Sequence, residues 1–192
     1  MRFIRTRTAR VAGAALFAVP LALGGLASQS HAQDASPSPS GTFGSGCSAL
    51  SQKTDTAKDK VTEAAAAYPQ LSQLVSATVR AKLSDAFDGK PDVTVFAPNN
   101  QAFQKVTVSQ LVSLLGDPGQ LKKVLTYHVV DKQITPDQLS KGSFTTVEGG
   151  KLTTSGSGST FKVNGEANIV CGNIKAANAT IYVIDSVLKP PS

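Results

Sequence analysis

His128 is the residue of this 192-residue chain best suited to acid–base chemistry, because the second histidine, His31, lies in a segment predicted to be removed. A Ser-His-Asp hydrolase could use His128 as its base. However, the Gly-x-Ser-x-Gly turn that presents the nucleophile in many such enzymes is missing from the sequence. The acidic residues are scattered and form no pair of the kind that glycosidases use. We therefore expect a protein that is not an enzyme, and a hydrolase is the alternative.

The sequence also lacks the motifs that bind metals and cofactors. No Cys/His spacing fits zinc, and no phosphate-binding glycine motif follows an expected strand. The run Gly156-Ser157-Gly158-Ser159 is typical of a flexible turn and is a weak phosphate-loop candidate at best. We expect no metal and no cofactor.

Tyr127 and His128 stand together where an expected helix runs into an expected strand, beside the apolar Leu125, Val129 and Val130. One interpretation is a structural histidine that is hydrogen-bonded to nearby backbone. The other is that Tyr127 and His128 contact a partner. The structural interpretation predicts that His128→Ala lowers the melting temperature.

Cys47 and Cys171 are the two cysteines of the chain. An even count in a secreted chain favours a disulfide, and the alternative is two free thiols. A bridge would enclose about 120 residues, for which the chain-entropy model gives roughly 4–5 kcal/mol. It would fasten the start of the domain to a strand near its end.

Residues 1–32 have the features of a secretory signal peptide. Four arginines precede an apolar stretch from Val11 to Leu26, and small residues precede a cut after Ala32. A membrane anchor is the alternative, but Pro20 and a Gly-Gly pair interrupt the stretch, and a span needs roughly 20 apolar residues. No cysteine lies at the cut, so we expect no lipid anchor there. The sequence thus predicts secretion, to the medium or loosely to the cell wall.

Residues 33–46 are rich in Pro, Ser and Gly and predict a flexible linker, because such a composition buries too little apolar surface to become ordered. Residues 47–192 are then long enough for one domain with one core. Four of the 19 basic residues and none of the 13 acidic residues lie in residues 1–32, so the mature chain has a net charge of +2. That balance does not support nucleic-acid binding.

The first half of the domain has helical patterns and the second half has short alternating ones. Expected helices cover Ser48–Ala67, a second stretch from Pro69 to Phe87, a short helix after Asn99, one capped by Ser109 and stopped at Gly116, and Pro118 to about Leu125. Expected strands are Ser143–Val147, Lys151–Thr154, Thr160–Val163, Ala167–Cys171, Asn173–Ala176 and Thr180–Val187. Asn164-Gly165 predicts a hairpin turn. Helices followed by strands indicate an α+β fold.

The stretch from Thr94 to Phe103 combines a strand, a proline and a helix start. Thr94 and Phe96 suit a buried strand, and Pro98 cannot donate to a sheet ladder. Asn99 is a suitable N-cap for the helix that carries Phe103. We expect these residues to support the fold before they bind anything.

Three segments together resemble the fasciclin domain family. Thr94–Phe103 resembles its first box, Leu125–Val130 its central Tyr-His motif, and Ala176–Pro191 its second box. They lie in the family's order across about residues 48–191. One departure is Asn178-Ala179, where many members have Asn-Gly; this variant resembles secreted actinobacterial members, including immunogenic secreted proteins of mycobacteria. In those relatives the two cysteines are bridged.

The resemblance implies a β-sandwich or wedge of about seven strands, with several helices packed on one side. It also implies an extracellular adhesion role, and in animal relatives the Tyr-His region is linked to integrin binding. Its structural motif residues are Thr94, Phe96, Pro98, Asn99, Phe103, Asn178 and Asp185. Asn178-Ala179-Thr180 also matches a glycosylation sequon, which we interpret as a turn.

The sequence therefore predicts a secreted, monomeric adhesion or interaction module without enzymatic activity. Its partner would be an extracellular protein or a cell-surface or matrix polysaccharide. The alternative is a carrier of a small apolar ligand in a cleft between helices and sheet. No membrane span is expected in the mature chain.

Overall fold

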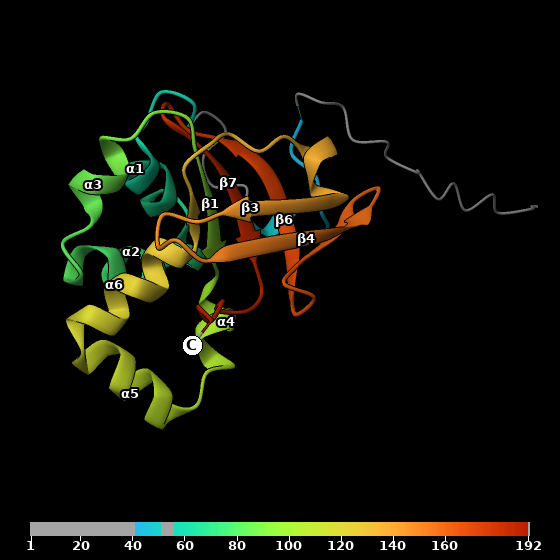
Figure 1. The fold of residues 1–192 in the computed structure, drawn as a ribbon. Coiled ribbons are helices and arrows are strands. Elements are labelled where there is room, and N and C mark those ends of the chain that lie inside the picture. Colours follow the sequence, from blue (N-terminus) through green and yellow to red (C-terminus); the bar gives the residue numbers. More distant parts are fainter. Residues whose placement is uncertain (1–40, 51–55, 192) are drawn as a thin grey trace, which may run out of the picture. The chain divides into compact units, whose positions relative to one another are not determined.

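The computed structural model describes residues 41–50 and 56–191, and Figure 1 shows helices gathered on one side of a sheet. The predicted signal peptide and most of the predicted linker lie outside these residues. The helices are η1 (Ser48–Leu50), α1 (Val61–Ala66), η2 (Pro69–Leu71), α2 (Ser72–Arg80), α3 (Ser84–Asp88), α4 (Asn100–Gln104), α5 (Val108–Gly116), α6 (Pro118–Tyr127) and η3 (Pro136–Leu139). The strands are β1 (Val93–Pro98), β2 (Val129–Val130), β3 (Lys141–Thr145), β4 (Lys151–Ser157), β5 (Thr160–Val163), β6 (Ala167–Lys175) and β7 (Ala179–Ile184).

The seven strands form one sheet in the order β2-β1-β7-β6-β5-β4-β3. All neighbours are antiparallel except β1 and β7, which run parallel. The two edges nearly meet, because Val130 bridges Thr146 and the Val147 amide donates to the Val129 carbonyl at 2.7 Å. The predicted α+β fold, with about seven strands and helices on one side, is confirmed.

The core has two parts that meet across β1 and β7. Val95 and Ala97 of β1 belong to the part under the helices, whereas Phe96 belongs to the part inside the curved sheet. The Phe96 ring stacks on Tyr182 of β7, with centroids 5.6 Å apart. Because both faces of these central strands are covered, every residue of β1 and β7 is buried. This explains the continuous apolar run from Val95 to Ala97.

The helical half is more broken than the sequence predicted. Within the predicted helix Ser48–Ala67, a short 3₁₀ turn ends at Leu50 and α1 begins only at Val61. The predicted helix from Pro69 to Phe87 ends at Arg80, where Lys82 takes a left-handed φ of 54°. The amide of Leu83 then bonds to Thr78 and that of Lys82 to Val79, which is a Schellman ending. The end of this helix was not predicted because a lysine occupies the left-handed position where glycine is usual.

The predicted linker was wrong at its C-terminal end, because Phe43 belongs to the domain. Phe43 is only 6% exposed, and its ring lies edge-on to Phe161 at 5.3 Å. Its backbone exchanges two hydrogen bonds with Gly172, at 3.2 and 2.8 Å. A Cβ at Gly172 would lie 2.4 Å from the Phe43 ring, so the glycine admits the aromatic side chain. The average composition of residues 33–46 concealed this one anchoring residue.

Two smaller differences concern element boundaries. The two strands expected at Ala167–Cys171 and Asn173–Ala176 form a single β6, which is bent by register shifts on either side of Cys171. The N-cap of α5 is Thr107, not Ser109: its side chain accepts from the Gln110 amide. The Asn164-Gly165 turn is present, with positive φ at both residues.

Candidate functional site

Tyr127 lies at the end of α6 and is 2% exposed. Its hydroxyl donates to the Lys151 carbonyl at 2.8 Å and accepts from Asn164 Nδ2 at 2.9 Å. Asn164 is the first residue of the β5–β6 turn, so Tyr127 joins the helical side to two strands. This side chain is enclosed by the domain.

His128 follows Tyr127 as the C-cap of α6 and is also 2% exposed. Nδ1 lies 2.7 Å from the Val124 carbonyl, and Nε2 accepts from the Leu188 amide at 3.0 Å. Because a carbonyl can only accept and an amide can only donate, the ring is the neutral tautomer with its proton on Nδ1. Burial lowers the pKa of His128 to about 4, although the bond to Val124 acts in the opposite direction.

Both nitrogens of His128 are therefore engaged by backbone, which leaves neither for a substrate or a metal. Of the roles left open by the sequence, this geometry favours the structural one over partner contact for Tyr127 and His128. Among the described residues, no group of three His, Cys, Asp or Glu side chains could hold a metal ion. Nor is any helix there long and apolar enough to cross a membrane.

Asn178, which immediately precedes β7, bonds through its side chain to two separate segments, the start of α1 and the end of α3 with the turn after it. Its Oδ1 accepts from the Val61 amide at 2.9 Å. Its Nδ2 donates to the carbonyls of Phe87 and Lys90 at 2.9 Å each, and of Asp88 at 3.3 Å. The side-chain amide of Asn178, the acceptor residue of the sequon, is thus engaged in hydrogen bonds within the domain. This is consistent with the interpretation of the motif as a turn.

Replacing Asn178 by Ala should lower the free energy of unfolding by about 2 kcal/mol, because partly buried backbone groups of two segments lose their partner. Urea denaturation checks this value. Asn99→Ala is the matched control: Asn99 makes a single capping bond to the Ala102 amide at 2.8 Å, worth about 1 kcal/mol. Equal losses for the two variants would contradict a joining role for Asn178.

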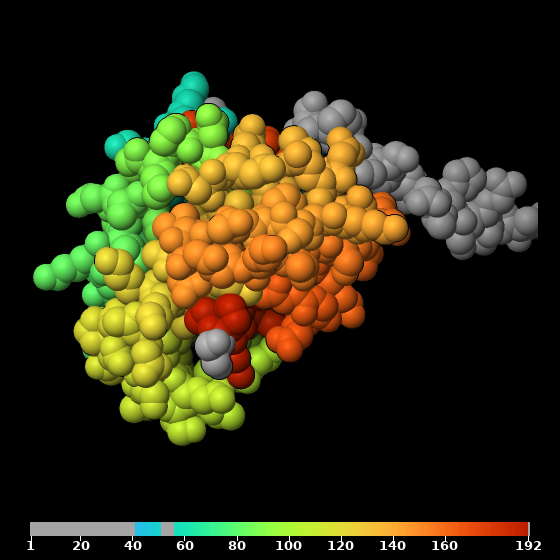
Figure 2. Space-filling model, in the orientation of Figure 1, coloured from blue at the N-terminus to red at the C-terminus, as the bar shows by residue number. Residues whose placement is uncertain are grey.

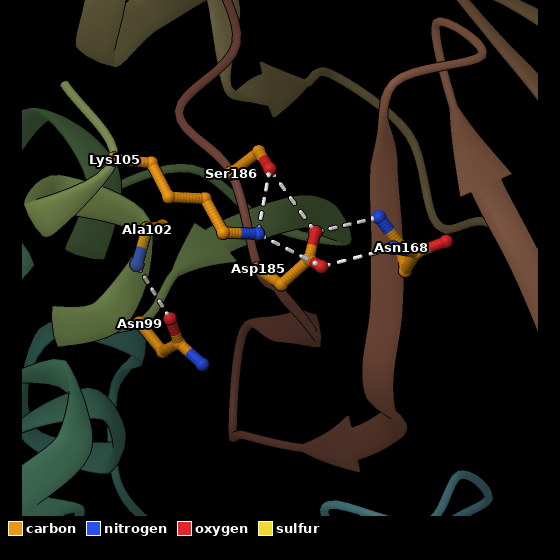
Figure 3. A network of polar contacts seen from close by, with 6 residues as sticks. All are labelled: Asn99, Ala102, Lys105, Asn168, Asp185 and Ser186. Carbon is orange, nitrogen blue, oxygen red and sulfur yellow. Dashed lines mark hydrogen bonds and ion pairs between the residues drawn. The ribbon is translucent and has the colours of Figure 1, made fainter.

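Asp185 fastens the end of β7 to its neighbours, as Figure 3 shows. Its carboxylate accepts from the backbone and side-chain nitrogens of Asn168 at 2.8 and 2.9 Å, and it pairs with Lys105 at 3.1 Å. Burial alone would raise the pKa of Asp185, but the bonds from Asn168 and Lys105 together hold it below its usual value. The contact ties the residue that follows α4 to β6 and β7.

Cys47 and Cys171 form a disulfide between residues 124 positions apart. Cys171 is buried in β6, four residues after Ala167, and Cys47 follows the segment anchored by Phe43. The bridge and Phe43 therefore hold the same N-terminal segment against the same strand. Neither cysteine is a free thiol.

The most exposed apolar surface of the described chain lies on α5. None of its residues is buried; Val108 and Val112 are 79% and 65% exposed. The helix has no charged side chain, although helices on a protein surface normally have a charged face. Val108 and Val112 are four residues apart, so they lie side by side on one stripe of the helix.

Open grooves of about 350 Å³ flank α5 on both sides. The α2–α5 groove is lined by Ser72, Gln73, Ser76, Ala77, Arg80, Phe103, Leu111 and Leu115. The C-terminal groove is lined by Val106, Ser109, Gln110, Ser113, Leu114, Gln120, Val124, Val187, Leu188 and Lys189. Figure 2 shows the C-terminal residues, in red, between the yellow helical surface and the orange strands.

Neither the exposed face of α5 nor these grooves was predicted from the sequence. The signal was present: the nine residues of α5 place apolar side chains on several faces of one short, uncharged helix. In a domain of this size such a helix cannot be covered all round, so part of it faces solvent. Tyr127 and His128, the candidate contact residues in the sequence, are buried and bonded within the domain.

Comparison with known proteins agrees with this architecture. A family model described as the fasciclin domain matches residues 69–190. Cell surface glycolipoprotein MPB83 of Mycobacterium bovis is 32% identical over 219 aligned positions, covering 98% of each chain. Immunogenic protein MPB70 of the same species is 37% identical, covering 94% of this chain and 93% of the relative. Protein sll1483 of Synechocystis is 35% identical over 74% of this chain.

A solved structure described as a FAS1 domain pair from the insect cell adhesion molecule fasciclin I is similar in fold, with a TM-score of 0.53 and 21% identity. The match covers 64% of this chain and 46% of that one, so this chain spans about half of the domain pair. The family match includes β1, the Tyr-His segment and β7, which are the three segments that carried the resemblance. This chain belongs to the fasciclin domain family.

Proposed function

We propose that this chain is a secreted interaction module that binds an extracellular protein or polysaccharide through α5. The observation that carries the proposal is the exposure of Val108 and Val112 on an uncharged helix. Contiguous exposed apolar surface favours association between proteins, and the two valines are neighbours on one stripe of the helix. Helices with exposed i, i+4 apolar pairs are also a common element of protein recognition.

A protein partner fits α5 better than a polysaccharide does. The hydroxyl groups of a sugar would lose water against two valines without gaining hydrogen bonds there. An apolar side chain of a protein has no such cost. The uncharged helix also avoids the desolvation of ions that weakens many contacts.

The environment of His128 supports a role without catalysis, since both of its ring nitrogens are bonded to backbone. Family membership and the name of the cell-surface relative support an extracellular location, in the medium or loosely on the cell wall. The predicted signal peptide, residues 1–32, agrees with that location.

Changing Val112 to Lys should reduce retention of the secreted chain on its partner by about tenfold, because a charge then has to be buried in the contact. The measurement is retention of immobilised chain against fractions of the producing cell's wall, host matrix and secreted proteins. Val79→Lys is the matched control, because Val79 is 59% exposed on α2.

Loss of retention in Val112→Lys with normal retention in Val79→Lys would support the proposal. Equal retention of both variants would place the contact elsewhere. No retention of the unchanged chain on any fraction would contradict the adhesion function itself.

A further inference from the structure

The C-terminal groove has two walls that come from distant parts of the chain. Val124 belongs to α6, and Leu188 belongs to the segment that follows β7. Leu114 of α5 lines the same groove. Its volume of about 350 Å³ lies in the range of small-molecule sites.

His128, which does not line the groove, connects its two walls through hydrogen bonds. Its Nδ1 bonds to the carbonyl of Val124, and its Nε2 accepts from the amide of Leu188. Leu188 is 3% exposed, so the segment is held firmly against the domain. A groove fixed in this way needs little rearrangement to bind a ligand, and preorganisation of that kind favours affinity.

The charge of the groove selects one kind of ligand. Lys189 is its single charged lining residue, and it is exposed at the end of the Leu188 segment. Within residues 41–50 and 56–191, the Lys189 ammonium has no ion-pair or hydrogen-bond partner. Ser109 and Ser113 of α5 supply hydroxyl groups beside the apolar lining. Over the part of the chain that the structure describes, the groove thus combines an apolar lining with one exposed positive charge.

We propose that the C-terminal groove binds a free anionic amphiphile with one acyl chain, such as a fatty acid. The chain lies against Leu114, Val124 and Leu188, and the carboxylate pairs with Lys189. This gives chemical identity to the small apolar ligand that the sequence left as an alternative. It does not depend on a protein partner for α5, because Val108 and Val112 do not line this groove.

The test is titration of the secreted chain with laurate below its micelle concentration, followed by calorimetry and by amide chemical shifts. We expect saturable binding of one laurate, with shifts at Leu114, Val124 and Leu188. Shortening the chain to decanoate should weaken binding by up to about fourfold per methylene.

Lys189→Glu should weaken laurate binding by about tenfold, because an exposed pair is replaced by repulsion. Arg80→Glu is the matched control, since Arg80 is the single charged residue lining the α2–α5 groove, which has a similar volume. It produces the same change in net charge and should alter binding by less than about twofold. Val112→Lys should leave laurate binding unchanged.

Several results would overturn the proposal. One is the absence of saturable laurate binding, and another is equal weakening by Lys189→Glu and Arg80→Glu. Equal affinity for dodecyltrimethylammonium would remove the role of charge. Binding to vesicles of anionic phospholipid without binding of free laurate would indicate a membrane surface instead. None of these results would affect the retention assay for α5.

Discussion

Replacing Cys47 and Cys171 together by Ala should lower the free energy of unfolding by about 5 kcal/mol. The bridge joins residues 124 positions apart, and the chain-entropy model gives about this value for a loop of that length. Alanine avoids placing a hydroxyl at position 171, which is 1% exposed. Urea denaturation of the two proteins, measured under oxidising conditions, gives the difference.

The unchanged protein in the presence of a strong reductant is the matched control and should approach the stability of the double variant. A loss below about 1 kcal/mol would contradict the expected contribution of the loop. It would show that Phe43 and its two backbone bonds to Gly172 already hold the N-terminal segment.

Lowering the pH from 7 to 4 should reduce the free energy of unfolding by about 3 kcal/mol through His128 alone. The pKa of this histidine falls from 6.5 to about 4 on folding, because the ring is buried. Between those values the unfolded chain binds the proton and the folded chain does not, so stability rises with pH throughout this window. Above about pH 6.5 the effect of His128 is complete and the curve should flatten.

Urea denaturation followed by circular dichroism at several pH values between 4 and 7.5 measures this dependence. His128→Gln is the matched variant, because its amide offers both a donor and an acceptor but does not titrate. Its stability should be nearly flat over the window. Protonation of Asp185 reduces the stability only at lower pH, because the pKa of this carboxylate lies below its usual value. An unchanged slope in His128→Gln would contradict the assignment to His128.

Much of this fold was predictable, because its central elements follow local rules. Thr94, Val95 and Phe96 are β-branched or aromatic, and β1 is indeed covered on both faces. Asn99 is a suitable cap, and its side chain accepts the Ala102 amide. Asn164-Gly165 has the residues that a tight turn needs, and both have positive φ. In each case the local preference and the tertiary environment agree.

Other features depended on contacts between distant residues. The left-handed Lys82 ends α2 where sequence offers no glycine, since Leu83 is needed in the core. Phe43 is a single aromatic residue in a stretch of small ones, and only its pocket beside Phe161 and Gly172 makes it structural. The walls of the C-terminal groove are brought together by a hydrogen bond across 60 positions of sequence, from Leu188 to His128.

The parallel pairing of β1 with β7 also determines the order in which this domain can fold. Val93 lies beside Ala179 of β7, and Phe43 lies beside Gly172 of β6. Segments from the first half of the chain therefore cannot pair until the last two strands are available. Pairing over such separations is slow compared with helix formation. A chain crossing a membrane N-terminus first therefore cannot complete its sheet until β7 has emerged. Closure of the Cys47–Cys171 disulfide likewise requires that β6, which carries Cys171, has emerged.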